Sequence, residues 1–208
     1  MTKSMCITYV VDGALYVNMT NRCSNRCDFC IRNNGDGAYG SDSLWLVREP
    51  TVGEILDSIF SRNLSAYFEL VFCGYGEPTC RLDDMLAVAA EVRAKFPGMR
   101  IRLNTNGHSD LINGRETAAD FHGLFDVISI SLNSPTPEGY DSVCHSVYGE
   151  RAHAALLKFA SDVKKYVPTV ALSVVREFIS EDDIAASRRL ADSVGVTLRI
   201  RDYIPPET

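Results

Sequence analysis

The sequence predicts an α/β protein: a partial (β/α)6 TIM-type barrel, open on one side, with an N-terminal β-hairpin. Apolar strand patterns alternate with amphipathic helix patterns along most of the chain, and this alternation is typical of a parallel sheet with right-handed crossovers. The chain has 208 residues, whereas a closed eight-stranded barrel usually takes about 250. An open sheet with six parallel strands therefore fits the length better. The alternative architecture is an open doubly wound sheet.

The hairpin is predicted at the N-terminal end. Residues 6–11 and 14–19 are rich in β-branched and aromatic side chains, and Asp12-Gly13 between them is a strong two-residue turn signal. The second arm leads directly into a segment that contains three cysteines. After that segment, residues 33–40 are rich in Gly and Asn, which indicates a mobile or ligand-shaped loop, and a lid is one interpretation of it.

From residue 51 onwards, helices and strands alternate. A helix is predicted over 51–62, where Thr51 and Glu54 form a capping-box pattern. Strands are predicted over 67–73, 99–103, 125–131, 170–175 and 196–200. Further helices are predicted over 82–96, 116–122, 151–166 and 182–194. With the second hairpin arm this makes six strands separated by helices, and in such folds the site lies at the carboxyl ends of the strands.

Composition predicts one globular domain, residues 1–208, with 46% hydrophobic and 23% charged residues. No apolar run is long enough to span a membrane, and the N-terminus lacks the features of a signal peptide. Seven cysteines without secretory features lead us to expect a cytoplasmic protein with thiolate chemistry rather than disulfides. The net charge of −6 and the scattered basic residues make nucleic-acid binding an unfavoured interpretation.

Arginines flank the cysteine segment and recur near the C-terminal end. They are Arg22, Arg26, Arg32, Arg199 and Arg201. Two interpretations are open: solvated surface charge, or assistance in binding an anionic substrate near the cysteines.

Cys23, Cys27 and Cys30 form a Cys-x3-Cys-x2-Cys run. Soft thiolate ligands select zinc, copper(I) or an iron–sulfur cluster. A structural zinc site needs four ligands, and no second Cys or His pair with suitable spacing follows. A cubane cluster held by three thiolates leaves one iron free to bind a small molecule, and this is the interpretation we prefer. The alternative is a non-enzymatic binding module stabilised by zinc, with Cys6 or Cys73 as fourth ligand.

Three further motifs follow the cysteine run at nearly equal spacing. They are Gly74-Tyr75-Gly76-Glu77-Pro78, Asn104-Thr105-Asn106-Gly107 and Ser131-Leu132-Asn133. In this order, and with Phe29 directly before the third cysteine, the motifs resemble those of the radical S-adenosylmethionine (SAM) superfamily. The short length and the residues around the cysteines are similar to the small subgroup of TatD-associated radical SAM proteins.

The resemblance implies a partial barrel in which the three cysteines hold a [4Fe–4S] cluster and the fourth iron binds SAM. In the superfamily, an electron from the cluster cleaves SAM to methionine and a 5′-deoxyadenosyl radical, which abstracts hydrogen from the substrate. The resemblance also places Phe29 near the adenine, although a packing role is equally compatible. It assigns the stretch Gly74, Tyr75, Gly76 and Glu77 to the amino group of SAM. Glu77 is expected to brace this turn, and Tyr75 stands where a Gly is more common.

Polar residues at the later strand ends are further candidates for SAM contacts. Asn104 and Asn106 can donate and accept hydrogen bonds, and Ser131 and Asn133 are spaced to point the same way and suit ribose hydroxyls. Arg176 follows a predicted strand and could pair with the carboxylate of SAM. The alternatives are strand-end capping for the Asn and Ser residues and a surface salt bridge for Arg176.

Two cysteines outside the motif are expected to be structural: Cys73 in the core, and Cys144 as a semi-buried thiol. For the substrate, the compact chain resembles both 7-carboxy-7-deazaguanine synthase and glycyl-radical activating enzymes, so that a small molecule and a protein are both open. The resemblance implies an electron donor such as flavodoxin or ferredoxin. The subgroup implies a pathway link to a TatD-type hydrolase.

Overall fold

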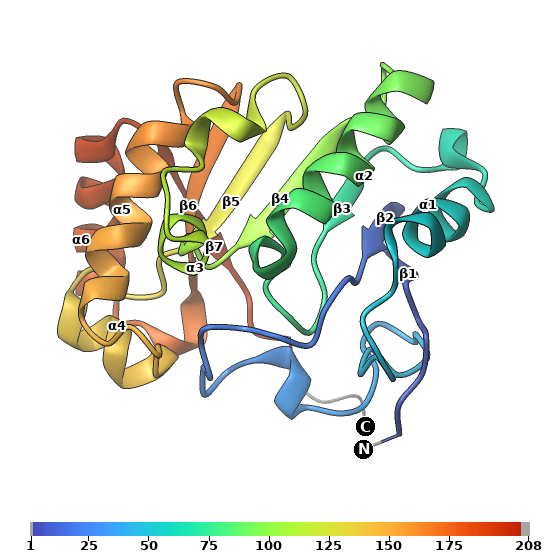
Figure 1. Cartoon of the computed structure of the whole chain (residues 1–208). Coiled ribbons are helices and arrows are strands. Elements are labelled where there is room, and N and C mark those ends of the chain that lie inside the picture. The colour runs from blue at the N-terminus through green and yellow to red at the C-terminus, as the bar shows by residue number, and fades with distance from the viewer. Residues whose placement is uncertain (1, 205–208) are drawn as a thin grey trace.

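The computed structural model of the chain describes residues 2–204. Its centre is one curved sheet with the strand order β1-β2-β3-β4-β5-β6-β7 (Figure 1). β1 (Thr8–Val11) and β2 (Ala14–Val17) form the predicted antiparallel hairpin. From β2 onwards, all neighbouring strands are parallel and follow one another in chain order. This unbroken order identifies the open (β/α)6 barrel rather than the doubly wound sheet, in which the strand order reverses at a switch point.

The remaining strands are β3 (Leu70–Phe72), β4 (Ile101–Thr105), β5 (Val127–Ser131), β6 (Thr169–Val175) and β7 (Thr197–Arg201). The α-helices are α1 (Val52–Phe60), α2 (Leu82–Lys95), α3 (Ser109–Asn113), α4 (Pro137–Cys144), α5 (Arg151–Val163) and α6 (Glu181–Val194). Short 3-10 helices are η1 (Ile31–Asn33), η2 (Leu64–Ala66), η3 (Pro78–Arg81), η4 (Ala118–Phe121) and η5 (Arg176–Phe178). None of the helices in residues 2–204 combines the length and apolar character that crossing a membrane requires.

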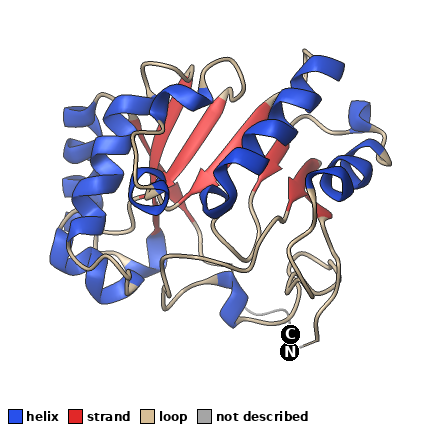
Figure 2. Cartoon of the chain, viewed as in Figure 1, coloured by secondary structure: helices blue, strands red, loops and turns tan. Residues whose placement is uncertain are grey.

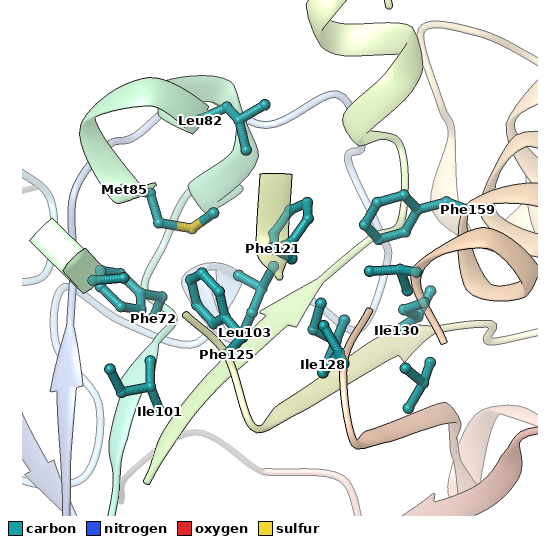
Figure 3. Packing of buried hydrophobic residues seen from close by; sticks show 14 of the residues in the cluster. Phe72, Leu82, Met85, Ile101, Leu103, Phe121, Phe125, Ile128, Ile130 and Phe159 are labelled. Atoms are coloured by element: carbon teal, nitrogen blue, oxygen red, sulfur yellow. The ribbon is translucent and has the colours of Figure 1, made fainter. Parts of the chain in front are cut away.

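The hydrophobic core lies between the outer face of the sheet and the helices that cover it (Figure 2). Strand residues that point outward alternate with residues that point into the barrel, because successive side chains of a strand face opposite sides. The outward set packs against α2, α5 and η4 (Figure 3). Phe121 is central to this packing, with ring centroids 5.4 Å from Phe125 and 5.6 Å from Phe159.

The inner face of the sheet is polar. Asn104 on β4 pairs in register with Ser129 on β5, and Ser131 pairs with Ser173 on β6. Strands of a parallel sheet covered on both faces are usually apolar on both sides. The polar inner face therefore marks a ligand cavity rather than a second packed layer.

The observed helices differ from the prediction in two respects. The helix expected over 116–122 is only the 3-10 turn η4, and the short helices α3 and α4 were not predicted. α4 is short, but Thr136 caps it by accepting a hydrogen bond from the Gly139 amide, and Pro137 occupies its first turn. Both residues are normal helix-start signals, so the sequence did contain local signals for α4.

Candidate active site at the carboxyl ends of the strands

A cavity of about 610 Å³ lies against the inner face of the sheet and the carboxyl ends of its strands. This volume is in the range of small-molecule and cofactor sites. Of the residues predicted from the sequence, twelve line the cavity together: Cys23, Cys27, Phe29, Cys30, Gly74, Tyr75, Gly76, Glu77, Asn104, Asn106, Ser131 and Asn133. Residues from four separate motifs therefore meet at one place.

The three cysteines of the motif are partly buried and line one part of this cavity. Burial raises the pKa of Cys23 to about 12 and also raises the pKa of Cys30. Within residues 2–204, no three His, Cys, Asp or Glu side chains converge as the ligands of a single metal ion do. A cubane cluster takes one thiolate on each of several irons, so its ligands line a cavity rather than meet at one point.

The cysteine segment is fixed by the last turn of α4. The Arg26 amide donates to the Cys144 carbonyl at 2.9 Å, and the Asp28 amide donates to the Val143 carbonyl at 3.1 Å. The final carbonyls of a helix have no partner inside the helix, so α4 offers them to the loop. The segment between the first and third cysteines thereby gains a defined backbone path.

A buried hydrogen-bond network also holds the cysteine segment in place. Asn106 donates to the Ser24 hydroxyl at 2.8 Å, and that hydroxyl lies 3.0 Å from Nδ1 of His108. Nε2 of His108 lies 3.1 Å from the Tyr140 hydroxyl, which accepts from Asn25 at 2.8 Å. Burial lowers the pKa of His108 to about 4, so the ring is neutral and can donate with one nitrogen and accept with the other. His108 is thus a link in the scaffold of the loop.

Cys144 is fully buried, not semi-buried as predicted. Its thiol hydrogen-bonds with that of Cys27 and accepts from Nδ2 of Asn133 at 3.4 Å. The hydrogen bond to Cys144, followed by burial, raises the pKa of Cys27. Cys144 therefore packs directly behind one of the cysteines of the motif.

Glu77 ties the ends of β3 and β4 together. Its carboxylate accepts from the Thr79 amide and hydroxyl at 3.0 and 2.8 Å, from the Thr105 hydroxyl at 2.8 Å, and from the Asn106 amide at 2.7 Å. Burial raises the pKa of Glu77, and these donors offset part of that shift. The expected bracing role is confirmed, and it extends beyond the local turn to the neighbouring strand end.

Gly74 and Gly76 are needed because the chain passes close to both of them. Neither has a positive φ angle, so unusual backbone conformation is not the cause. A Cβ on Gly76 would lie closer than 3.0 Å to the carbonyl oxygens of Thr20 and Arg22, and one on Gly74 would collide with the Asn18 side chain. The two glycines let the β3 loop approach the segment that leads into Cys23.

We therefore expect Gly76→Ala to push the Thr20–Arg22 backbone away and to lower the free energy of unfolding by about 1–3 kcal/mol, as overpacking does. Iron incorporation into the adjacent cysteine segment should fall with it. Gly98→Ala is the matched control, because no atom lies within 4 Å of a Cβ there. Urea unfolding and iron content measure both effects. If Gly76→Ala and Gly98→Ala behave alike, the close approach is not a constraint.

Tyr75 is buried and fastens the loop over residues 33–40. Its hydroxyl donates toward the carbonyls of Gly35 and Gly37, each at 2.9 Å. Asn34 donates to the Ile204 carbonyl at 2.7 Å and accepts from the Tyr203 hydroxyl at 3.1 Å. The loop thus connects the β3 end with the segment after β7 and forms a wall of the cavity. The structure describes this packed arrangement; whether the loop also opens as a lid stays a prediction.

Phe29 lines the cavity and also packs against Phe178, with ring centroids 4.9 Å apart. Both predicted roles, ligand contact and packing, are compatible with this position. Three buried side-chain oxygens on the cavity wall have no hydrogen-bond partner: Oδ1 of Asn25, Asn104 and Asn133. Buried polar atoms are normally paired, so unpaired acceptors here favour a ligand that donates hydrogen bonds.

Arg176 is the one predicted site residue that does not line the cavity. It lies in η5, where its guanidinium is half-exposed, 3.5 Å from Glu181 and 3.9 Å from Asp202. This position matches the surface salt bridge that the sequence left open. The proposed pairing with the carboxylate of SAM stays a prediction without support from this geometry.

The two cysteines considered as a fourth zinc ligand lie in different places. Cys6 borders a separate surface hollow with Ser58 and Arg62. Cys73 lines the main cavity, beside Asn104, so its expected place in the hydrophobic core is wrong. Successive side chains of a strand face opposite sides. Phe72 therefore points to the hydrophobic core under the helices, and Cys73 points to the cavity inside the barrel.

Several cavity residues were missed by sequence reasoning, namely Asn25, Ser129, Ser173 and Arg102. Ser129 and Ser131 alternate with buried Ile128 and Ile130, and that period of two would have identified Ser129. Arg102 stands between buried Ile101 and Leu103 on β4, so the same alternation would have identified it. Asn25 has no such local signal.

Comparison with known proteins places these features in a family. Residues 17–191 match the model of the radical SAM superfamily. A radical SAM methyltransferase from Sphaerobacter thermophilus has a similar structure, with a TM-score of 0.64 and 16% identity over 94% of this chain and 57% of that one. The structure of SuiB from Streptococcus suis bound to S-adenosylmethionine is also similar, with a TM-score of 0.63 and 13% identity over 91% of this chain and 40% of that one. A comparison with curated protein sequences gives no significant match.

TsrM from Kitasatospora setae, a radical SAM methyltransferase with cobalamin and a [4Fe–4S] cluster bound, gives a TM-score of 0.54 at 11% identity, covering 91% of this chain and 34% of that one. The chain thus spans less than two thirds of each of these proteins, and at these identities the likeness shows the fold. The family match is the stronger finding, because residues 17–191 include the cysteine run and all three strand-end motifs. The chain therefore belongs to the radical SAM superfamily.

Proposed function

We propose that Cys23, Cys27 and Cys30 hold the [4Fe–4S] cluster and that the cavity beside them binds SAM. Membership of the superfamily makes the chain an enzyme whose cofactors are a [4Fe–4S] cluster and SAM. The observation that carries the residue assignment is the convergence of the three thiols and the three strand-end motifs on one cavity. Their donor chemistry fits the group, because thiolates are the usual ligands of iron–sulfur clusters.

When bound, the cluster supplies the electron that cleaves SAM to methionine and a 5′-deoxyadenosyl radical, which abstracts hydrogen from the substrate. The protein contributes orientation and exclusion of water. The unpaired oxygens of Asn104 and Asn133 are suited to accept from the amino or ribose donors of SAM, with Ser131 beside them, and Phe29 offers an apolar surface to the adenine. Tyr75 and the 33–40 loop would separate the reacting groups from solvent.

The electron donor in this proposal is a small redox protein such as flavodoxin or ferredoxin. The substrate is a small molecule or a protein segment, and reactions like those of 7-carboxy-7-deazaguanine synthase or of glycyl-radical activating enzymes represent these two classes. The pathway link to a TatD-type hydrolase and the cytoplasmic location stay predictions from the sequence.

The proposal predicts slow SAM cleavage even without substrate. After anaerobic reconstitution with iron and sulfide, addition of SAM and dithionite should give 5′-deoxyadenosine and methionine in equal amounts, measured by chromatography. Omission of dithionite is the control and should give neither product. An intact cluster without SAM binding in calorimetry would contradict the cofactor assignment, and a colourless protein that binds zinc would favour the non-enzymatic alternative.

A further inference from the structure

Three arginines that have no role in the SAM assignment line the cavity. Arg102 lies on β4, and Arg199 and Arg201 lie on β7. Since Arg199 and Arg201 are two residues apart on a strand, their side chains leave the same face of the sheet, and that is the face toward the barrel interior. These positive charges therefore face the cavity, where Arg201 is partly buried and Arg199 is exposed.

The charge of Arg102 is balanced within the protein. Its Nη2 lies 3.0 Å from Oε1 of Glu69 and donates to the Tyr16 hydroxyl at 3.1 Å. Arg102 and Glu69 are both mostly buried, with side chains 13% and 6% exposed. A buried and hydrogen-bonded pair of this kind explains Arg102 without any ligand.

Arg201 has no such partner. Across residues 2–204, no carboxylate oxygen lies within 4.0 Å of its guanidinium or of that of Arg199. The buried Nε of Arg201 has no hydrogen-bond acceptor among residues 2–204. Burial is the main cause that lowers the pKa of Arg201, and the positive charge of nearby Arg199 lowers it further. Burying a cation without a counter-charge is costly, and an anion at this place would remove the cost.

The acidic residues on the cavity wall do not provide that anion. They are Asp12, Glu77 and Asp202. Glu77 already accepts four hydrogen bonds, and Asp202 is 88% exposed beside Arg176. Within residues 2–204, therefore, no carboxylate of the cavity wall supplies the missing counter-charge.

Position separates Arg201 from the predicted SAM contacts. Apart from Phe29 in the cysteine segment and Arg176 in η5, those come from the ends of β3, β4 and β5, whereas β7 is the far edge of the sheet. β7 also lies beyond residues 17–191, which match the superfamily model. A residue outside the shared segment is suited to recognise what differs between members, which is the substrate.

We infer that, within the proposed function, Arg201 with Arg199 binds the oxyanion of a small substrate, a carboxylate or a phosphate, inside the partial barrel. A guanidinium fork presents paired N–H donors that match either oxyanion. The substrate enters with this group toward β7, which leaves its other end facing the cysteine segment. Arg201 is in this assignment a binding residue that sets substrate class.

The test uses the reconstituted protein saturated with SAM, without reductant, in isothermal titration calorimetry. Benzoate and inorganic phosphate are titrated separately, and benzamide is the uncharged counterpart of benzoate. We expect wild type to bind at least one of the two anions and not benzamide, and the preferred anion identifies the group. Arg201→Gln should weaken that binding by roughly 10- to 100-fold, the size of a lost charge-assisted hydrogen bond. Arg188→Gln on the exposed face of α6 is the matched control and should bind as wild type does.

The same titrations are repeated without SAM. Three results would overturn the inference: no anion binding to wild type at about 10 mM in either condition, equal binding to Arg201→Gln, or binding without SAM that saturating SAM abolishes. The last result would assign Arg201 to the cofactor. If Arg201→Gln does not fold, phenylglyoxal labelling of wild type replaces it, and the preferred anion should protect Arg201 in peptide mass spectrometry; equal labelling with and without the anion would count against the site. Formation of 5′-deoxyadenosine by the same wild-type preparation reports on the proposed function separately.

Discussion

Replacing Cys23, Cys27 and Cys30 together by Ala is expected to abolish iron binding and SAM cleavage. Wild type should carry about four irons per chain after reconstitution, and the triple variant should carry none. Cluster assembly depends on thiolates because they are the ligands that hold its irons. Colorimetric iron and sulfide analysis, together with the visible spectrum, measures the loss.

Cys6→Ala is the matched control for that experiment. Cys6 is a partly buried thiol that borders a different hollow, so its removal should leave the iron content unchanged. A triple variant that keeps its iron would refute the ligand assignment, and loss of iron in Cys6→Ala alone would point to a different ligand set. Circular dichroism on both variants checks that the fold survives.

The second large effect is expected at Glu77. Glu77→Ala should remove four hydrogen bonds from a buried site and leave the amides of Thr79 and Asn106 without acceptors. Each buried unpaired donor costs about 1–3 kcal/mol, so we expect a loss of roughly 2–5 kcal/mol in unfolding free energy. SAM affinity should fall as well, because the ends of β3 and β4 both line the cavity.

Glu77→Gln distinguishes charge from shape. The amide keeps the size of the side chain, but its NH2 group must face one of the four donors that the carboxylate accepts. One of these contacts then becomes repulsive, so this variant should also be destabilised, though less than Glu77→Ala. Glu91→Gln, an exposed position on α2, is the control and should stay within about 0.5 kcal/mol of wild type. Denaturant unfolding compares the unfolding free energies of the three variants, provided that the dependence on denaturant concentration is the same for each. A Glu77→Gln protein as stable as wild type would exclude a bracing role for the carboxylate.

Much of the fold could be predicted from the sequence because its signals are local. Alternation of side chains along a strand, the capping box at Thr51 and the Asp12-Gly13 turn each depend on residues a few positions apart. All six parallel strands and the hairpin were found in this way. The missed helices α3 and α4 are short, with 5 and 8 residues. The only signals for α4 were Thr136 and Pro137 at its start.

The candidate site was predictable to a similar degree and for a similar reason. Parallel strands with right-handed crossovers bring their carboxyl ends to one edge, so any motif at a strand end is placed near the others. Twelve of the thirteen predicted residues line one cavity for this reason. Arg176 departs from the rule because it begins η5, where the chain has left the strand and its side chain turns toward Asp202.

The sequence by itself therefore determined the family, the alternation of strands and helices along the chain and the group of residues around the cysteines, since spacing along the chain encodes each of these. The order of the strands in the sheet, which excludes the doubly wound alternative, came from the tertiary structure. Only the tertiary structure decided what supports and surrounds those residues. The contact of Cys144 with Cys27 and the path from Ser24 through His108 to Tyr140 join residues far apart in the chain. The surroundings of Arg201, which hold no carboxylate within 4.0 Å among residues 2–204, likewise depend on distant segments. Such contacts depend on how helices and strands pack in three dimensions, and no local pattern records whether a charge inside a barrel finds a partner there.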